Sequence, residues 1–124
     1  MDVTPLIARD RKVIQSYVGG LFRISGQRYE GAVMVLPDDV IPWPAPSALQ
    51  DFRESDFDIV AARAGDTDVI LFGVGEKMQS LPLTLKNNLA QRGLRADIMD
   101  TGAACRTYNV LLAEGRRVMA LLLP

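Results

Sequence analysis

The sequence is short of the residues that carry most enzyme and metal chemistry, because it has no histidine and a single cysteine, Cys105. Histidine supplies most general bases at neutral pH and, together with cysteine, most ligands of zinc sites. Histidine-based triads, histidine proton relays and cysteine clusters around zinc or iron–sulfur centres are therefore excluded. A single thiol also excludes a disulfide within the chain. We recognise no catalytic constellation and expect neither a resident metal nor a cofactor.

Long apolar segments are also missing. The longest uninterrupted apolar run, 118–123, is far shorter than the roughly 20 residues that span a bilayer. The beginning of the chain has no apolar core of signal-peptide length. It is charged instead, with Asp2, Arg9, Asp10, Arg11 and Lys12. Together with the lone cysteine, these features favour a cytoplasmic protein.

The composition is that of one soluble domain over residues 1–124. Of the 124 residues, 48% are hydrophobic and 23% are charged, which suits a single core. The net charge of −1 argues against a general nucleic-acid binder. Acidic residues gather at 38–58 and basic residues at 77–117. Each set is either a solvated face or one of two complementary patches for docking onto a partner.

The first third of the chain has the pattern of antiparallel strands. Apolar stretches at 13–18, 21–24 and 29–36 are separated by Gly19-Gly20 and Ser25-Gly26, which are signals for tight turns. The next segment, 37–46, has four prolines around or near Trp43 and is neither helix nor central strand. Trp43 is either packed inside the domain, or an exposed aromatic that binds a partner or covers one sheet face.

The remainder alternates helices and strands. Ser55 is expected to cap a short helix, and Ser80 with Pro82 to open a second helix over 81–92. Gly93 ends that helix in the left-handed conformation of a C-cap. A third helix is expected over about 101–114, with buried strands at 69–72, 96–99 and 118–123. Two strand–helix units in tandem predict an α/β domain whose sheet is covered by helices.

The expected third helix carries an apolar stripe at helical spacing, formed by Ala104, Cys105, Tyr108, Leu111 and Leu112. We expect this stripe to pack against strands 69–72 and 118–123. Cys105 is then a small buried hydrophobe rather than a nucleophile. Asn109 lies at the edge of the stripe and is expected to form hydrogen bonds, either to a neighbouring loop or to a ligand or partner. Val110 faces away from the stripe and indicates a second contact, either with another layer of the same chain or with another subunit.

One loop has the sequence context of a phosphate-binding turn. Gly73-Val74-Gly75 follows a strand and precedes a helix, but Met78 stands where a dinucleotide fingerprint has its third glycine. A tight turn at a strand end is the simpler interpretation. If strands 69–72 and 96–99 are parallel, the loops after them emerge at one sheet edge, where ligands of open α/β sheets bind. The residues that would form an anion or carboxylate site there, unless they are only turn and cap residues, are Gly73, Gly75, Gly102 and Arg106.

The segment 100–116 has a specific signature. It reads DTGAACRTYNVLLAEGR and contains Thr-Gly, Ala-Cys, Thr-Tyr-Asn and Glu-Gly-Arg in that order. In these elements it resembles the family of the mitochondrial complex I assembly factor three. That family also includes an adipogenesis-associated animal protein and bacterial and archaeal proteins of unknown function. The resemblance extends to Gly73-Val74-Gly75 (usually Gly-Thr-Gly in the family), Gly93, Tyr29-Glu30-Gly31 and Trp43.

The resemblance implies a fold and a kind of role rather than a reaction. The implied fold is a three-layer α/β domain with a central mixed β-sheet flanked by helices, plus additional N-terminal antiparallel β-hairpins. The implied role is that of a non-enzymatic protein-interaction or assembly-type factor, with protein partners that include, as one option, a second copy of the chain. The alternative is a small-molecule or anion-binding protein, or else an enzyme, that uses the Gly73-Val74-Gly75 loop. A start without a mitochondrial presequence fits a bacterial-type member.

Overall fold

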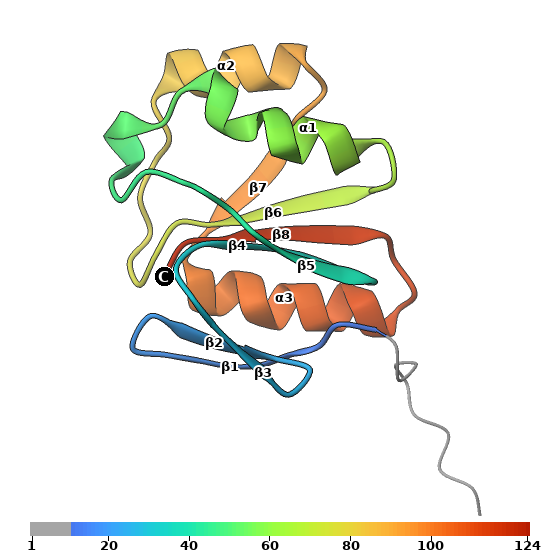
Figure 1. The fold of residues 1–124 in the computed structure, drawn as a ribbon. Coiled ribbons are helices and arrows are strands. Elements are labelled where there is room, and N and C mark those ends of the chain that lie inside the picture. Colours follow the sequence, from blue (N-terminus) through green and yellow to red (C-terminus); the bar gives the residue numbers. More distant parts are fainter. Residues whose placement is uncertain (1–10) are drawn as a thin grey trace, which may run out of the picture.

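The computed structural model describes residues 11–124 (Figure 1), so that Asp2, Arg9 and Asp10 of the charged start lie outside the described residues. A small antiparallel sheet contains β1 (Ile14–Val18), β2 (Leu21–Ile24) and β3 (Gln27–Glu30). The main sheet has the spatial order β5 (Asp39–Pro42), β4 (Val33–Leu36), β8 (Val118–Leu122), β6 (Val69–Gly73) and β7 (Ala96–Met99). The helices are α1 (Asp58–Ala64), α2 (Leu83–Gln91) and α3 (Thr101–Ala113), preceded by 3₁₀ turns at Leu49–Asp51 and Glu54–Phe57.

The main sheet is mixed, which confirms the predicted fold class. β6 is parallel to β7 and β8, whereas β4 is antiparallel to β5 and β8. Helix α2 connects β6 to β7, and α3 connects β7 back across β6 to β8. Because these connections run in opposite directions along the sheet, the usual right-handedness places α2 and α3 on opposite faces. Figure 1 shows α1 and α2 on one face and α3 on the other, with the small sheet beyond α3.

The main sheet divides its buried side chains between two apolar cores. Along β8, Met119 and Leu121 point toward α1 and α2, whereas Ala120 and Leu122 point toward α3. This alternation is the period of a strand that is buried on both faces. We call the first the aromatic core, defined by Trp43, Phe52, Phe57 and Phe72. The second is the α3 core, defined by Tyr108 and Leu112 of α3 with Phe22 and Ile24 of β2.

The apolar stripe of α3 is buried against the sheet, which confirms the prediction for four of its five residues: Ala104, Cys105, Tyr108 and Leu112. Leu111 is only half-buried, because its direction on the helical wheel lies at the margin of the stripe. Val110 lies off the stripe and is 58% exposed, so within residues 11–124 no second layer covers it, and a contact with another subunit stays a prediction. No helix within residues 11–124 is long and apolar enough to cross a membrane.

The predicted single strand 29–36 is wrong. The chain leaves β3 after Glu30 and enters β4 at Val33, so the two halves belong to different sheets. Gly31, between them, has φ of +78°, a conformation that only glycine adopts without strain. The prediction followed the apolar run and gave too little weight to this glycine.

The predicted Ser55 cap is wrong, and the predicted opening of the second helix is only partly right. Ser55 lies inside the 3₁₀ turn, where the Asp56 carboxylate accepts the Arg53 N–H at 2.8 Å instead. Helix α2 begins after Pro82 without a side-chain cap, so Ser80 plays no capping role. The Gly93 cap is confirmed: its φ is +79°, and the next N–H donates back to the Leu89 carbonyl at 2.9 Å. The proline-rich segment 37–46 contributes β5, an edge strand rather than a central one.

Candidate functional site

Three parallel strands end together at the carboxyl edge of the main sheet. Strands β6 and β7 are parallel, as the candidate site requires, so the glycine loop lies beside the start of α3. The Thr101 N–H donates to the Gly75 carbonyl at 2.8 Å. At the end of β8, the Leu123 N–H donates to the Gly73 carbonyl at 2.9 Å. The loop is therefore bonded to the segments on both of its sides.

The side chain of Thr101, the first residue of α3, links the same three segments. The residue is fully buried. Its hydroxyl donates to the Leu123 carbonyl at 2.6 Å and accepts the Gly75 N–H at 2.8 Å. The sequence pattern predicts this residue only as a helix start, and its linking role was not predicted. The available signal was a threonine directly after one strand and beside the Gly-x-Gly loop of another.

The two glycines of the loop are required for different reasons. A Cβ on Gly73 would lie 2.9 Å from the Thr101 Cα and 3.1 Å from the Ala104 Cβ, so β6 approaches α3 closely only without a side chain. Gly75 has φ of +110°, which residues with a side chain rarely adopt. Its N–H and C=O are both bonded to Thr101. Both backbone hydrogen-bonding groups of Gly75 thus already have partners within the protein.

The start of α3 holds the other two residues predicted for an anion site, Gly102 and Arg106. Asp100 caps the helix, because its Oδ1 accepts the Ala103 N–H at 2.9 Å. This carboxylate supplies the negative charge that the positive helix end favours. A Cβ on Gly102 would lie 3.4 Å from both Asp100 Oδ1 and Arg106 Nη1, so the exposed guanidinium lies beside the cap. The structure therefore places the four residues predicted for the anion site within about one helical turn of the carboxyl edge.

Asn109 joins α3 to the small sheet. Its Oδ1 accepts the Ile14 N–H at 3.0 Å, and its Nδ2 donates to the Ile14 carbonyl at 2.7 Å. The side-chain amide pairs with β1 as the backbone of another strand would. The expected hydrogen bonds are therefore made, to a strand rather than to a loop. Next to it, the Tyr108 hydroxyl donates to the Lys12 carbonyl at 2.7 Å.

Trp43 is packed inside the domain and is only 3% exposed. The centroid of its ring lies 5.5 Å from those of Phe52 and Phe57 and 5.6 Å from that of Phe72. Its indole N–H donates to the Asp56 carbonyl at 2.9 Å. Of the interpretations that the sequence left open, the packed one describes its position.

An open groove of about 750 Å³ lies beside the glycine loop. Its walls come from the link before β4, from residues 45–50 and from the loop after β6, which brings in Glu76 and Lys77. Gly75 lines this groove, whereas the other residues predicted for the anion site, and Asn109 and Trp43, do not. Its volume falls within the range of small-molecule sites. The loop after β6 therefore borders an open groove at the carboxyl edge.

Two buried titratable groups lie near this edge. The phenolic oxygen of Tyr17 is buried and has no hydrogen-bond partner within residues 11–124, although Thr101 is close. Burial, and to a lesser extent the charge of Glu76, raises the pKa of Tyr17. Burial also raises the pKa of the Cys105 thiol to about 12. Little thiolate therefore forms at neutral pH, which agrees with Cys105 as a buried hydrophobe.

Comparison with known proteins identifies relatives across nearly the whole chain. A family model described as "Protein of unknown function (DUF498/DUF598)" matches residues 14–123. An uncharacterised protein from Rhodobacter capsulatus is 39% identical over 90% of this chain and 83% of its own length. NADH dehydrogenase (ubiquinone) 1 alpha subcomplex assembly factor 3 is 35% identical in Rattus norvegicus and 32% in Homo sapiens, over 90% of this chain. The chain spans 60% of the length of these two mammalian proteins.

Solved structures show the same fold. A Bordetella parapertussis protein has a TM-score of 0.80 and 33% identity, covering 92% of this chain and 96% of that chain. A Bordetella pertussis protein described as a Mth938-like domain has a TM-score of 0.80 and 27% identity, covering 100% and 92%. An outer membrane protein from Bartonella henselae has a TM-score of 0.75 and 33% identity, covering 93% and 96%.

Proposed function

Since the chain belongs to the family of proteins of unknown function DUF498/DUF598, we propose that it is a non-enzymatic protein-interaction factor of the assembly type. The observation that carries this proposal is its similarity, over 90% of the chain, to assembly factor 3 of mammalian NADH dehydrogenase. The chain spans only 60% of the length of those proteins. A similar role and similar partners are therefore proposed for this chain rather than shown.

The chemistry of the carboxyl edge supports a role without catalysis. The Thr101 hydroxyl, both backbone groups of Gly75 and the Asp100 carboxylate are bonded to one another or to neighbouring backbone. Groups held in this way fix the loops in place and are not poised to attack a substrate. The high pKa of the Cys105 thiol also supports a role without catalysis, because little of the reactive thiolate forms at neutral pH.

The partners that we propose are proteins, among which a second copy of this chain is one option, and the proposed location is the cytoplasm. The names of two relatives refer to membranes: a Francisella tularensis "13 kDa major membrane protein", 29% identical, and the Bartonella henselae outer membrane protein. Fractionation of the native cells tests the location. Recovery in the soluble fraction supports it, and retention in salt-washed membranes contradicts it.

A crosslinking pull-down of the tagged chain from its own cells, at native expression, tests the proposed function. We expect the same protein partners in every replicate and none of them with the tag alone. If no protein is enriched and a nucleotide or metabolite co-purifies instead, the assembly-type role is contradicted and ligand binding is favoured.

The alternative is an anion or carboxylate site formed by Gly73, Gly75, Gly102 and Arg106. It is supported by the groove beside Gly75 and by the position of the Arg106 guanidinium next to the start of α3. An NMR titration with phosphate, a nucleotide and an acidic peptide tests it. Shifts of the Gly75 and Gly102 amide signals that disappear in Arg106→Gln support the site. Signals that stay still at millimolar ligand contradict it.

A further inference from the structure

Strand β7 forms one edge of the main sheet, and its outer side carries free backbone groups. Its neighbour within residues 11–124 is β6. The Met99 carbonyl accepts the Val74 N–H at 2.9 Å, so Met99 points its backbone groups toward β6. Because these groups alternate in direction along a strand, Ala96 and Ile98 point theirs outward. No loop or side chain of residues 11–124 bonds to them.

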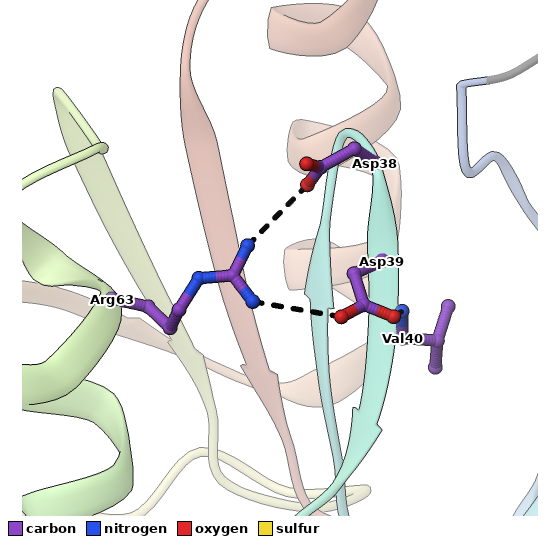
Figure 2. Close-up of polar contacts among 4 residues, drawn as sticks. All are labelled: Asp38, Asp39, Val40 and Arg63. Carbon is purple, nitrogen blue, oxygen red and sulfur yellow. Dashed lines mark hydrogen bonds and ion pairs between the residues drawn. The ribbon is translucent and has the colours of Figure 1, made fainter.

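The strand at the opposite edge, β5, has no outward N–H group available for a further strand (Figure 2). The backbone N–H of Trp43 donates inward to the carbonyl of the residue before β4. Because backbone groups alternate in direction along a strand, those of Val40 and Pro42 face outward. The Val40 N–H is bonded to Asp39 Oδ1 at 2.9 Å, and proline has no N–H. Arg63 holds Asp39 in place, with its Nη1 3.5 Å from the other carboxylate oxygen. A strand that approached β5 would therefore find no free N–H donor on it.

The side chains of β7 suit an added strand on both faces. Ile98 is half-buried against the aromatic core and Met99 is half-buried against the α3 core. A neighbouring strand would cover the exposed remainder of both. Asp97, between them, is exposed and is the single charge of the strand. Natural edge strands often carry lysine or proline that discourages pairing, and β7 has neither.

We propose that β7 binds an extended segment of a partner protein as an additional strand, with a lysine or arginine of the partner opposite Asp97. This inference rests on the proposed function, because it names the surface by which an interaction factor holds its partner. Main-chain hydrogen bonds would come from Ala96 and Ile98, and apolar partner residues would lie beside Ile98 and Met99.

The charge of Asp97 favours a different protein over a second copy of this chain. Antiparallel pairing of two β7 strands through Ala96 and Ile98 of both copies would place Asp97 directly opposite its own equivalent. Like charges opposite each other destabilise a strand pair, whereas opposite charges stabilise it. A partner segment of the form apolar–basic–apolar satisfies the same hydrogen bonds without this repulsion.

Two end-blocked peptides of alternating valine and threonine test the proposal, one with a central lysine and the other with a central glutamate. In an NMR titration of the full chain, we expect the lysine peptide to shift the Ala96 and Ile98 amide signals and to slow their exchange with solvent. The glutamate peptide should bind about fivefold more weakly. Asp97→Lys should reverse the preference. Asp66→Lys, the same charge change in an exposed turn before β6, should leave it unchanged.

A backbone variant separates strand pairing from general attraction of charges. Ala96→Pro removes an outward N–H and leaves the bonds to β6 intact, as proline at the first position of an edge strand does. We expect it to bind the lysine peptide about tenfold more weakly, whereas Ala96→Val binds normally. Absence of binding at millimolar peptide, equal binding of both peptides, or shifts confined to other strands would overturn the proposal.

The pull-down of the native chain distinguishes failure of this surface from failure of the proposed function. Partners lost from Ala96→Pro but kept by Ala96→Val support the β7 surface. Partners kept by both variants overturn this surface and leave the assembly-type role standing. A wild-type chain that captures no protein overturns the role itself. A stable dimer in sedimentation that Ala96→Pro dissociates would also overturn the proposed choice of partner.

Discussion

The two cores of the main sheet are held by different kinds of interaction. In the aromatic core, four rings pack with centroids 5.5–5.9 Å apart, in tilted or edge-on arrangements. On the α3 side, buried or half-buried polar side chains bond to backbone far away in the sequence: Thr101 to Leu123, Tyr108 to Lys12 and Asn109 to Ile14. Ring packing therefore dominates the aromatic core, where the Trp43 indole N–H adds one bond to the Asp56 carbonyl, whereas several directed hydrogen bonds add to the packing on the α3 side.

This difference affects how each face should respond to substitution. Aromatic contacts have no single required partner, so a truncated ring leaves a cavity whose cost scales with the volume removed. A deleted hydroxyl or amide instead leaves its former partners buried and unsatisfied, at about 1–3 kcal/mol each. The aromatic core already contains a small apolar cavity of about 30 Å³, lined by Val60 and Phe57 among others.

The largest effect is expected from Trp43→Ala, which removes the centre of the aromatic core. We expect the free energy of unfolding to fall by about 3–5 kcal/mol, measured by urea denaturation followed by circular dichroism. Trp43→Phe retains a ring but removes the indole N–H that bonds to the Asp56 carbonyl, and it should lose less stability than the alanine variant. A loss below about 1 kcal/mol for the alanine variant would show that the core collapses around the gap.

Thr101→Val tests the α3 side, because it keeps the shape of the side chain and removes only the hydroxyl. The Gly75 N–H and the Leu123 carbonyl then lose their partner, and we expect a loss of about 2 kcal/mol in stability. The Gly75 amide should also exchange faster with solvent than in the wild type. Thr101→Ser, which keeps the hydroxyl, should protect that amide. Unchanged exchange in the valine variant would contradict the linking role.

Asn109→Ala should loosen the small sheet specifically. We expect a loss of about 1–2 kcal/mol, together with faster hydrogen exchange at Ile14. Asn88→Ala is the matched control, because Asn88 is also half-buried but makes a single side-chain bond, 3.3 Å long, to the exposed Glu54. Equal losses in the two variants would mean that the Asn109 amide does not hold β1.

The buried thiol of the α3 core predicts a dependence of stability on pH. Burial raises the pKa of Cys105 to about 12 in the folded chain, whereas an unfolded thiol titrates near 8.5. Between these values the unfolded chain loses its proton and the folded chain keeps it, so rising pH favours unfolding. We expect a fall of about 1.4 kcal/mol between roughly pH 7.5 and 9.5. In Cys105→Ala the fall should largely disappear, and an equally steep fall would contradict this cause.

The smallest effect is expected from adding one methylene to each core. Val60→Ile extends a side chain toward the small cavity of the aromatic core, and we expect a gain of up to about 0.8 kcal/mol. Val35→Ile adds the same group in the α3 core, where Val35 is fully buried, and should be destabilising. Thermal unfolding of the two variants measures the sign of each change. The same sign in both would show that the cores are equally packed.

The parts of this molecule that the sequence predicts well are those whose causes are local. The stripe of α3 and the Gly93 cap follow from spacing and from single residues within a few positions. The split at Gly31 was missed because it depends on which sheet each half of an apolar run joins. The role of Thr101 depends on Gly75 and Leu123, which only the finished sheet brings near. Whether Trp43 is packed or exposed could not be predicted for the same reason, since its partner rings come from three other segments.

The position of β8 has a consequence for how the chain is made. It is the last strand in the sequence but lies between β4 and β6 in the main sheet. Every residue of β4 is buried in the finished protein, yet 82 positions separate Leu36 from Val118, the start of the strand that covers it. At translation rates of 5–20 residues per second, about 4–16 s pass between the synthesis of β4 and the synthesis of β8. The interval of greatest aggregation hazard therefore falls during synthesis, when the nascent chain most needs a chaperone.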